Sequence, residues 1–576
     1  MHIHDVLVVG GGPAGLAVAA RLYEQTPAAT FTDDEHQRYH WIKKHGRKVN
    51  IKNYRTNKNS LPTPPSSPET SDGGYDDHIT DNTLDMMVLD ADGAEWMSKW
   101  NRLFSTFGID YLRSPMFFQI DPADRDALLA YAYEQEREKE LQALPGCTGK
   151  EISKHKKKKR LNAKGRFLGR TPDVDERDRK DYFVPSANLF ASHCSQVIER
   201  YHLGKDTLRQ EKVTDIEHDS IAAFQDDEAD DDDDDLSNSS LDEDVTKIFR
   251  VTTDQSVRFA RVVILAVGPG NAPSIPPIAG LPTPAAPHEG YTHAMQIKHF
   301  PPPHVKAKID AQRTTRMLIV GGGLTSIQLA DLALKRGVSK VWLLIRGDVK
   351  VKYFDVDLDW VGKFRNYKHA EFWTADTDQE RFDMINRARN GGSMTPRYRK
   401  ILQAHVSTGK ISLHTHTTLH SLSWDPTSTS WSDIVVAPPP ATALPQIDYI
   451  VFATGIHSDI QTIPFLHSLR RTHPVDTIGG LPCLNDDLMW NDQVPLFVTG
   501  RLAALRLGPG APNLVGARIG AERIAWNVEH VLNKMGRLGA TKKQAGETVS
   551  SEDEKMEAYA AARDNRFDSL VEVGES

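Results

Sequence analysis

The stretch DVLVVGGGPAG at Asp5–Gly15 reads as an apolar strand that runs into a glycine-rich turn, and MLIVGGGLTS at Met317–Ser326 repeats this pattern. Residues with helical periodicity follow each turn. In such a turn the first glycine permits a tight reversal, the second lets the backbone approach a diphosphate, and the third position lets helix and strand pack closely. The diphosphate then lies at a helix N-terminus, where unpaired amides favour negative charge. We therefore expect two dinucleotide-binding sites, formed by Gly10, Gly12, Pro13, Ala14 and Gly15 in the first turn and by Gly321, Gly323, Leu324, Thr325 and Ser326 in the second.

The residue at the end of the next strand distinguishes the two sites, because it meets the adenosine ribose about twenty positions after the motif. After the first turn, Asp34 and Glu35 have the spacing to accept hydrogen bonds from ribose hydroxyls, which suits FAD. The strand after the second turn ends in Arg346, and a guanidinium there grips a 2'-phosphate, so NADPH is expected rather than NADH. The alternative for Arg346 is a solvated strand end.

The composition is that of a large globular protein. The 576 residues are 39% apolar and 26% charged, with a net charge of -8 that gives no indication of nucleic-acid binding. No apolar run approaches a membrane-spanning length, and the first predicted strand begins at Asp5, so we expect a cytoplasmic protein without signal peptide or membrane partner. Cys147, Cys194 and Cys483 form no Cys-x-x-Cys pair, which argues against a disulfide relay.

Three segments, 56–82, 150–180 and 225–244, read as insertions into the fold. The first is rich in Pro, Ser and Gly and is expected to be disordered. The second contains the basic run Lys154–Arg160, a solvated loop or, alternatively, a stretch recognised by a nuclear importer or an acidic partner. The third is acidic and is expected at the tip of a long hairpin; it lacks the glycine of an EF-hand, and no metal site is predicted. The charged tail 541–576 is expected to be flexible.

Three later strands, at 259–268, 448–455 and 495–500, each end in a glycine. A buried strand that ends this way lets the chain cross between layers beside a cofactor. After the third, a Gly/Pro-rich loop leads into a helix over 515–534, whose first amides would face the pyrimidine edge of a flavin. Val213 opens a strand that would contact adenine through its backbone, with core packing as the equal alternative. These features add Val213, Gly268, Thr454, Gly455, Gly500, Asn513 and Leu514 to the candidate cofactor-binding residues.

The order GGGPAG, LAVGPG with its prolines, GGGLTS, FATG and a glycine-led terminal helix resembles the two-dinucleotide-domain flavoproteins. Among them the chain is most similar to class B flavin monooxygenases, notably the L-ornithine and L-lysine N-hydroxylase branch and its uncharacterised relatives. In that branch an acidic strand end precedes a tryptophan by seven positions, which corresponds to Asp34 and Trp41 here. Tyr291–Ala294 resembles the segment that leads into the NADPH domain. The Phe-x-Gly-x-x-x-His fingerprint of flavin-containing monooxygenases and the Leu-Leu-Ser ending of ornithine hydroxylases are absent from the sequence.

The resemblance implies an α/β fold with two Rossmann-like three-layer domains, the NADPH domain inserted into the FAD domain. Residues 1–310 and 444–540 would form the FAD domain and 311–443 the NADPH domain, with the substrate at their interface. The implied mechanism is reduction of FAD by NADPH, followed by reaction with molecular oxygen to a C4a-hydroperoxide that hydroxylates a small nucleophilic substrate, an amine among the possibilities. That mechanism requires no acid or base to form the hydroperoxide, so no catalytic residue is predicted.

Several interpretations stay open at this point. His293 would contact the nicotinamide side or be structural, and the polar stretch 387–397 would close over the cofactor or form a surface loop. Two other functions compete with the monooxygenase. One is an FAD-dependent NAD(P)H reductase of a quinone or another acceptor, and the other is a non-catalytic flavoprotein that acts as an interaction module.

Overall fold

The computed structural model describes residues 1–24, 27, 84–144, 147, 182–204, 206–226, 247–268, 273–282, 288–362, 365–440 and 443–535. Asp34, Glu35 and Trp41, almost all of the three inserts and the tail lie outside the described residues. Residues 1–27 and 86–531 form one compact unit, which contains both glycine-rich turns. Nearly all of the second unit, 28–85 and 532–576, lies outside the described residues.

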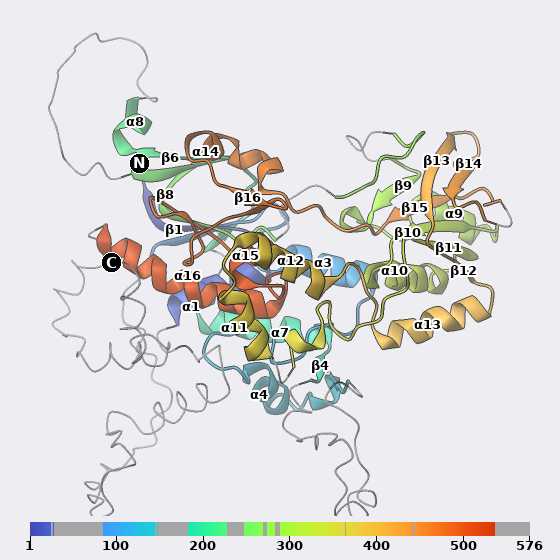
Figure 1. Ribbon diagram of the computed structural model, residues 1–576, viewed down its shortest axis with the longest axis horizontal. Helices are drawn as coiled ribbons and strands as arrows, with labels where there is room; N and C mark the ends of the chain where they lie inside the picture. The colour runs from blue at the N-terminus through green and yellow to red at the C-terminus, as the bar shows by residue number, and fades with distance from the viewer. Residues whose placement is uncertain are drawn as a thin grey trace, which may run out of the picture. The chain divides into compact units, whose positions relative to one another are not determined.

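The first glycine-rich turn follows a central strand of an eight-stranded sheet (Figure 1). The sheet runs in the order β18-β19-β8-β1-β2-β5, and β1 is parallel to both β2 and β8. Val6–Val9 are buried, as expected for a parallel strand covered on both faces. The strands are β1 (Ile3–Val9), β2 (Met86–Leu89), β5 (Leu208–Arg209), β6 (Val213–Ser220), β7 (Lys247–Thr253), β8 (Val257–Leu265), β18 (Met489–Asn491) and β19 (Val494–Val498).

The hairpin expected around the acidic insert is present. β6 and β7 are antiparallel, with Ser220 opposite Lys247, and β7 pairs in turn with β8. The short helix α8 (Ile221–Asp226) follows β6 directly. The acidic insert therefore connects two antiparallel strands, where added length costs little.

Helices accompany the first sheet. α7 (Ala187–Arg200) begins at Ser186, whose hydroxyl accepts from the amide of Leu189 at 2.9 Å, and it buries an apolar face that includes Phe190 and Val197. The other helices are α1 (Pro13–Tyr23), α3 (Ser98–Phe107), α4 (Ala127–Glu134), α14 (His467–Thr472), α15 (Ala504–Leu507) and α16 (Leu514–Lys534). Two short strand pairs are β3 (Leu141–Gln142) with β4 (Val184–Pro185) and β16 (Thr477–Ile478) with β17 (Leu481–Pro482).

The second glycine-rich turn follows the middle strand of a five-stranded parallel sheet, in the order β12-β11-β10-β15-β9. The predicted boundaries at 311 and 443 do not coincide with the ends of this sheet. The difference arises because β9 and β15, both assigned from the sequence to the first domain, are strands of this sheet: β15 pairs with β10 from Met317 opposite Tyr449, and β9 pairs with β15. The strands are β9 (Tyr291–His293), β10 (Arg316–Val320), β11 (Lys340–Ile345), β12 (Ile411–Thr415) and β15 (Tyr449–Phe452).

Two apolar cores flank this second sheet. On one face, Met317 and Ile319 pack with residues of α10 and α13. On the other, Leu318 and Phe452 pack against a β-hairpin that includes the fully buried Trp431. Figure 1 shows α13 and the hairpin on opposite sides of the strands. The helices beside this sheet are α9 (Pro303–Asp310), α10 (Leu324–Lys335) and α13 (Pro396–Ser407), and the hairpin is β13 (Thr418–Asp425) with β14 (Ser430–Ala437). By contrast, α11 (Arg365–Trp373) and α12 (Asp378–Arg389) lie beside α15 and α16 (Figure 1), and Asp378 of α12 forms an ion pair with Arg506 of α15.

Within the described ranges, no helix combines the length and apolar character needed to cross a membrane.

Candidate dinucleotide and substrate site

The first turn has the shape that the sequence predicts. Gly10 has φ +115°, and a Cβ there would lie 2.5 Å from the carbonyl oxygen of Ala266, so only glycine fits. A Cβ at Gly15 would lie 1.9 Å from the carbonyl oxygen of Gly10. The absence of a side chain at Gly15 therefore lets α1 pack close to β1. Gly12 is the N-cap of α1 and carries no capping side chain, and a Cβ there would meet no atom within 4 Å. The N-cap of α1 is thus open, and a helix start without a capping side chain suits an anion.

An acid that the sequence analysis missed lies beside this turn. β2 pairs with β1 and is followed by Asp90, whose Oδ2 accepts from the amide of Gly11 at 2.6 Å. Asp90 therefore occupies the strand-end position that the spacing rule gave to Asp34 or Glu35. The rule failed to find it because 62 residues, 24–85, separate α1 from β2. The sequence feature that could have identified Asp90 is the apolar run Met86–Leu89 followed directly by an acid.

The second turn repeats the geometry of the first. Gly321 has φ +145°, and a Cβ there would lie 2.4 Å from the carbonyl oxygen of Ala453. Gly323 is the uncapped N-cap of α10. In the first turn of that helix, the buried hydroxyl of Ser326 has no hydrogen-bond partner among the described residues. Arg346 follows β11, is exposed and makes no side-chain hydrogen bond to a described residue.

The polar stretch 387–397 approaches the second turn. A Cβ built on Gly392 would lie 3.0 Å from Cα and 3.1 Å from the amide nitrogen of Gly323. Lys350 fixes the start of this loop, because its Nζ lies 2.7 Å from the carbonyl oxygen and 2.8 Å from Oδ1 of Asn390. The loop therefore lies directly against the glycine-rich turn.

The segments that follow β8 and β15 are joined to each other. The amide of Ser274 donates to the carbonyl oxygen of Gly455 at 3.1 Å, and the hydroxyl of Thr454 donates to the carbonyl oxygen of Ser274. Gly268 and Gly455 have φ +66° and +85°, as glycines at chain crossings allow. The predicted crossings thus lie side by side.

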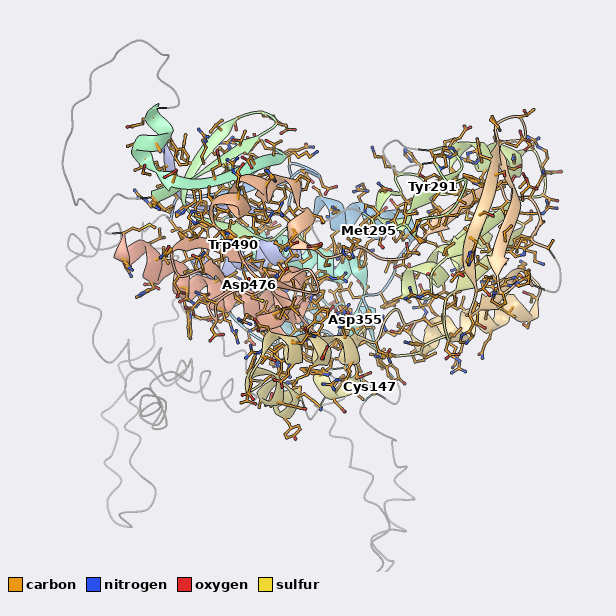
Figure 2. All side chains as sticks on the ribbon, turned by 45° about the horizontal axis from the view of Figure 1, so that its top comes forward. Cys147, Tyr291, Met295, Asp355, Asp476 and Trp490 are labelled. Carbon is orange, nitrogen blue, oxygen red and sulfur yellow. The ribbon has the colours of Figure 1, made fainter. Side chains whose placement is uncertain are left out.

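His293 ends β9 next to this crossing. Its Nδ1 accepts from the amide of Met295 at 3.2 Å, and its Nε2 has no partner among the described residues (Met295 is labelled in Figure 2). Burial lowers the pKa of His293 to about 4, so the ring is neutral at pH 7.

Asp355, which lies between β11 and α11, is the centre of a polar cluster that contacts the loop before α16. Oδ1 of Asp355 accepts from the side-chain amide of Asn513 at 2.8 Å, and Oδ2 lies 2.9 Å from Nη2 of Arg389 (Asp355 is labelled in Figure 2). Arg389 also donates to the carbonyl oxygen of Pro509 at 3.0 Å. The loop 509–513 is therefore tied to residues that follow the second turn in the chain. Gly500, with φ +70°, precedes Arg501, and Leu514 is buried at the start of α16.

Arg113 joins distant segments near this cluster. Its guanidinium donates to the carbonyl oxygens of Tyr353 at 3.1 Å and Phe354 at 2.6 Å and to the hydroxyl of Ser393 at 2.9 Å. Burial lowers its pKa to about 10, although Asp355 opposes the shift, so Arg113 stays charged at neutral pH. Ser393 belongs to the polar stretch 387–397 that the sequence singled out, but its contact with Arg113 was not predicted, because it depends on the tertiary fold.

A cavity of about 10 Å³ lies beside α16. Its lining is mostly apolar, and Asn513 and His369 are its polar residues. Burial lowers the pKa of His369 to about 4.

Val213, which was a candidate for contact with adenine, lies at the start of β6, where it is buried and pairs with Thr253.

No protein-family model matches the chain, and no curated protein matches it in sequence. Solved structures do resemble it. An ornithine N-hydroxylase from Kutzneria sp. 744, with reduced FAD, NADP+ and L-ornithine, superposes with a TM-score of 0.55 at 13% identity, over 92% of this chain and 99% of that one. The FAD-bound cadaverine monooxygenase of desferrioxamine biosynthesis from Erwinia amylovora gives 0.53 at 13% identity, over 92% and 95%.

L-lysine 6-monooxygenase from Pseudomonas syringae gives a TM-score of 0.51 at 15% identity, over 92% of this chain and 99% of that one. Identities this low establish the fold alone. The predicted α/β class with two Rossmann-like lobes is confirmed by this likeness and by the two sheets, of which the second is parallel and the first is parallel from β19 to β5.

Proposed function

We propose that this chain is an FAD-dependent monooxygenase that uses NADPH and molecular oxygen to hydroxylate a small nucleophilic substrate. The observation that carries the proposal is the repetition of one anion cradle. Two helices, α1 and α10, begin at a glycine without a capping side chain and without an acid in the first turn. Both lie in a fold shared with flavin-dependent N-hydroxylases.

The first cradle fits FAD. Gly12 leaves the start of α1 open for a diphosphate, and Asp90 lies at the strand end where a ribose hydroxyl would donate. In this proposal the terminal loop and Gly500, Asn513 and Leu514 lie along the flavin edge. Bound FAD would supply hydride acceptance and oxygen activation, and the protein's task would be to orient the rings and exclude water.

The second cradle fits NADPH. Arg346 places a cation at the end of β11 that makes no side-chain hydrogen bond to a described residue, where a 2'-phosphate would bind. Thr325 and Ser326 lie in the first turn of α10, whose uncapped start would face the diphosphate. The loop around Gly392 would cover the cofactor from the outer side.

A reductase that uses thiols is disfavoured by the state of the cysteines. All three are free. Burial raises the pKa of Cys147 to about 12 and that of Cys483 to about 11, and it raises the pKa of Cys194 as well. Thiol exchange needs the thiolate, which these environments suppress.

The test is a rapid-mixing experiment on FAD-loaded protein. The flavin is first reduced anaerobically with NADPH or NADH, and the reduced protein is then mixed with oxygen. A monooxygenase predicts a long-lived absorbance phase between reduced and oxidised flavin, and hydroxylated product in place of hydrogen peroxide once a substrate is supplied. Direct return to oxidised flavin would favour a reductase of another acceptor. If neither nucleotide reduces the flavin, the function that remains is that of a non-catalytic flavoprotein acting as an interaction module.

A further inference from the structure

Three side chains that can ligate a metal ion meet at the amino end of the first sheet. They are His2, His4 and Asp85, and one ligand atom from each, an imidazole nitrogen or a carboxylate oxygen, lies within 4.8 Å of the other two. Within the described ranges, no other set of three His, Cys, Asp or Glu side chains comes together in this way. The set belongs to neither glycine-rich turn, so the proposed function gives it no role.

The pairing of two strands fixes these positions. His2 directly precedes β1 and His4 follows two positions later, so both rings lie on one face of the strand. Their ring centroids are 4.5 Å apart in a T-shaped contact. Asp85 directly precedes β2, whose first residue, Met86, pairs with Val6 of β1. Two parallel, hydrogen-bonded strands therefore bring two imidazoles and one carboxylate to the same edge of the sheet.

The burial of the three side chains suits an ion that binds from solvent. His4 is 7% exposed and thus anchored, whereas His2 is exposed and Asp85 is half-buried. In a tetrahedral zinc site, bonds of about 2.0–2.1 Å place the ligand atoms about 3.4 Å apart. A small rotation of the exposed His2 ring therefore suffices to close the set, and the open side leaves room for water as a further ligand.

The donor atoms indicate which metal is bound. Calcium and magnesium take oxygen ligands, and copper(I) prefers sulfur. Imidazole nitrogen combined with carboxylate oxygen suits zinc. We propose that His2, His4 and Asp85 bind one zinc ion, with water in the remaining coordination position.

The position of the ion indicates a structural role. β1 is seven residues long, and its other end leads into the turn at Gly10, while β2 leads to Asp90. A strand of that length separates the metal site from the first turn by roughly 20 Å. The ion therefore fastens the amino ends of the two strands whose carboxyl ends form the first cradle, and it stabilises the folded protein because the unfolded chain does not keep the three ligands together.

The test is a zinc titration of untagged, FAD-loaded protein from which metal has been removed with a chelator. Competition with a coloured zinc indicator measures the stoichiometry and the Kd, and thermal unfolding measures the midpoint. One ion per chain is expected, with a midpoint that rises with zinc concentration and does not respond to magnesium. The absence of zinc binding, or a midpoint that zinc leaves unchanged, would overturn the proposal.

Variants assign the ion to its ligands. His2→Gln, at an exposed position, and Asp85→Asn, which keeps the side-chain shape, are each expected to raise the Kd for zinc at least about tenfold. His416→Gln is the matched control, because the exposed His416 also faces a carboxylate, with Nε2 2.9 Å from Oδ1 of Asp348, but belongs to no set of three. FAD content establishes that each variant is folded.

The outcomes separate this site from the flavin chemistry. Equal zinc affinity in the parent protein and the His2 and Asp85 variants would place the ion elsewhere and overturn the proposal. Zinc binding that these two variants lose, in a protein that never oxygenates a substrate, would uphold the metal site and refute only the monooxygenase function.

Discussion

Arg113 donates twice to Ser393, to the carbonyl oxygen at 3.2 Å and to the hydroxyl at 2.9 Å, although 280 positions separate them. The same guanidinium also donates to carbonyl oxygens of residues 352–354. One side chain from the loop after α3 thus fixes the chain segments before α11 and after α12. These segments carry Asp355 and Gly392, so Arg113 is a positioning residue for the candidate site.

Replacement of Arg113 tests this role. Arg113→Met removes the donors and leaves buried carbonyl oxygens unpaired, which is expected to lower the free energy of unfolding by about 3 kcal/mol. Arg113→Lys keeps the charge but loses the planar guanidinium with its several N–H donors. It is therefore expected to recover only part of the lost free energy of unfolding. Urea unfolding of the FAD-loaded protein measures both. Equal stability of the three proteins would show that the contacts contribute little.

Asp90 is expected to govern FAD affinity. Asp90→Asn weakens a charge-assisted hydrogen bond from Gly11 and removes the acceptor charge for a ribose hydroxyl, so the Kd for FAD should rise about tenfold. Flavin fluorescence after ultrafiltration gives the Kd. Asp92→Asn is the matched control, because Asp92 forms ion pairs with the solvent-accessible Lys99 and Arg102, and exposed pairs contribute little. Equal losses in the two variants would remove Asp90 from the site.

The sequence predicted those parts of the fold that depend on local pattern. The turns at Gly10 and Gly321 could be predicted because only glycine fits the backbone at these two positions. Asp90 was missed because the insertion before β2 breaks the usual spacing. The contacts of Arg113, Arg389 and Asp355 could not be predicted from the sequence. They join residues that are far apart in the chain, and such contacts produce no periodic pattern.

Gly392 is expected to matter for NADPH and not for FAD. In Gly392→Ala the new Cβ would crowd the backbone of Gly323, which cannot yield as a flexible side chain would. The loop must then move away from the second turn, and we expect the KM for NADPH to rise about tenfold. Steady-state NADPH oxidation gives the KM, and FAD content should stay constant. Gly204→Ala, where a Cβ meets no atom within 4 Å, controls for the loss of a glycine. An unchanged KM would show that the loop around Gly392 does not contribute to NADPH binding.

Arg346 is expected to select NADPH over NADH. Arg346→Gln removes the cation that would pair with a 2'-phosphate, so the ratio of kcat/KM for NADPH to that for NADH should fall about tenfold. The value for NADH itself should hardly change, since NADH has no such phosphate. A parallel fall for both nucleotides would point to a structural role, and an unchanged ratio would make Arg346 a solvated strand end.

Acid is expected to destabilise the protein through its buried histidines. His218, on β6, packs against Phe249 and His473, and burial lowers its pKa to about 4. His473, Lys247 and Asp219 are the ionisable groups that act on it, the first two lowering the pKa and the last raising it. The unfolded chain binds a proton at His218 near pH 6.5 while the folded protein does not. The stabilisation is therefore fully present above about pH 6.5 and is lost as the pH falls towards 4.

The matched variant isolates this contribution. His218→Phe removes the titrating group and keeps a ring between Phe249 and His473, so between pH 4.5 and 6 the slope of unfolding free energy against pH should flatten by up to about 1.4 kcal/mol per pH unit. Urea unfolding across this range supplies the slopes for both proteins. Parallel curves would mean that His218 takes up its proton in the folded state as readily as in the unfolded chain, and that water reaches the ring despite its packing.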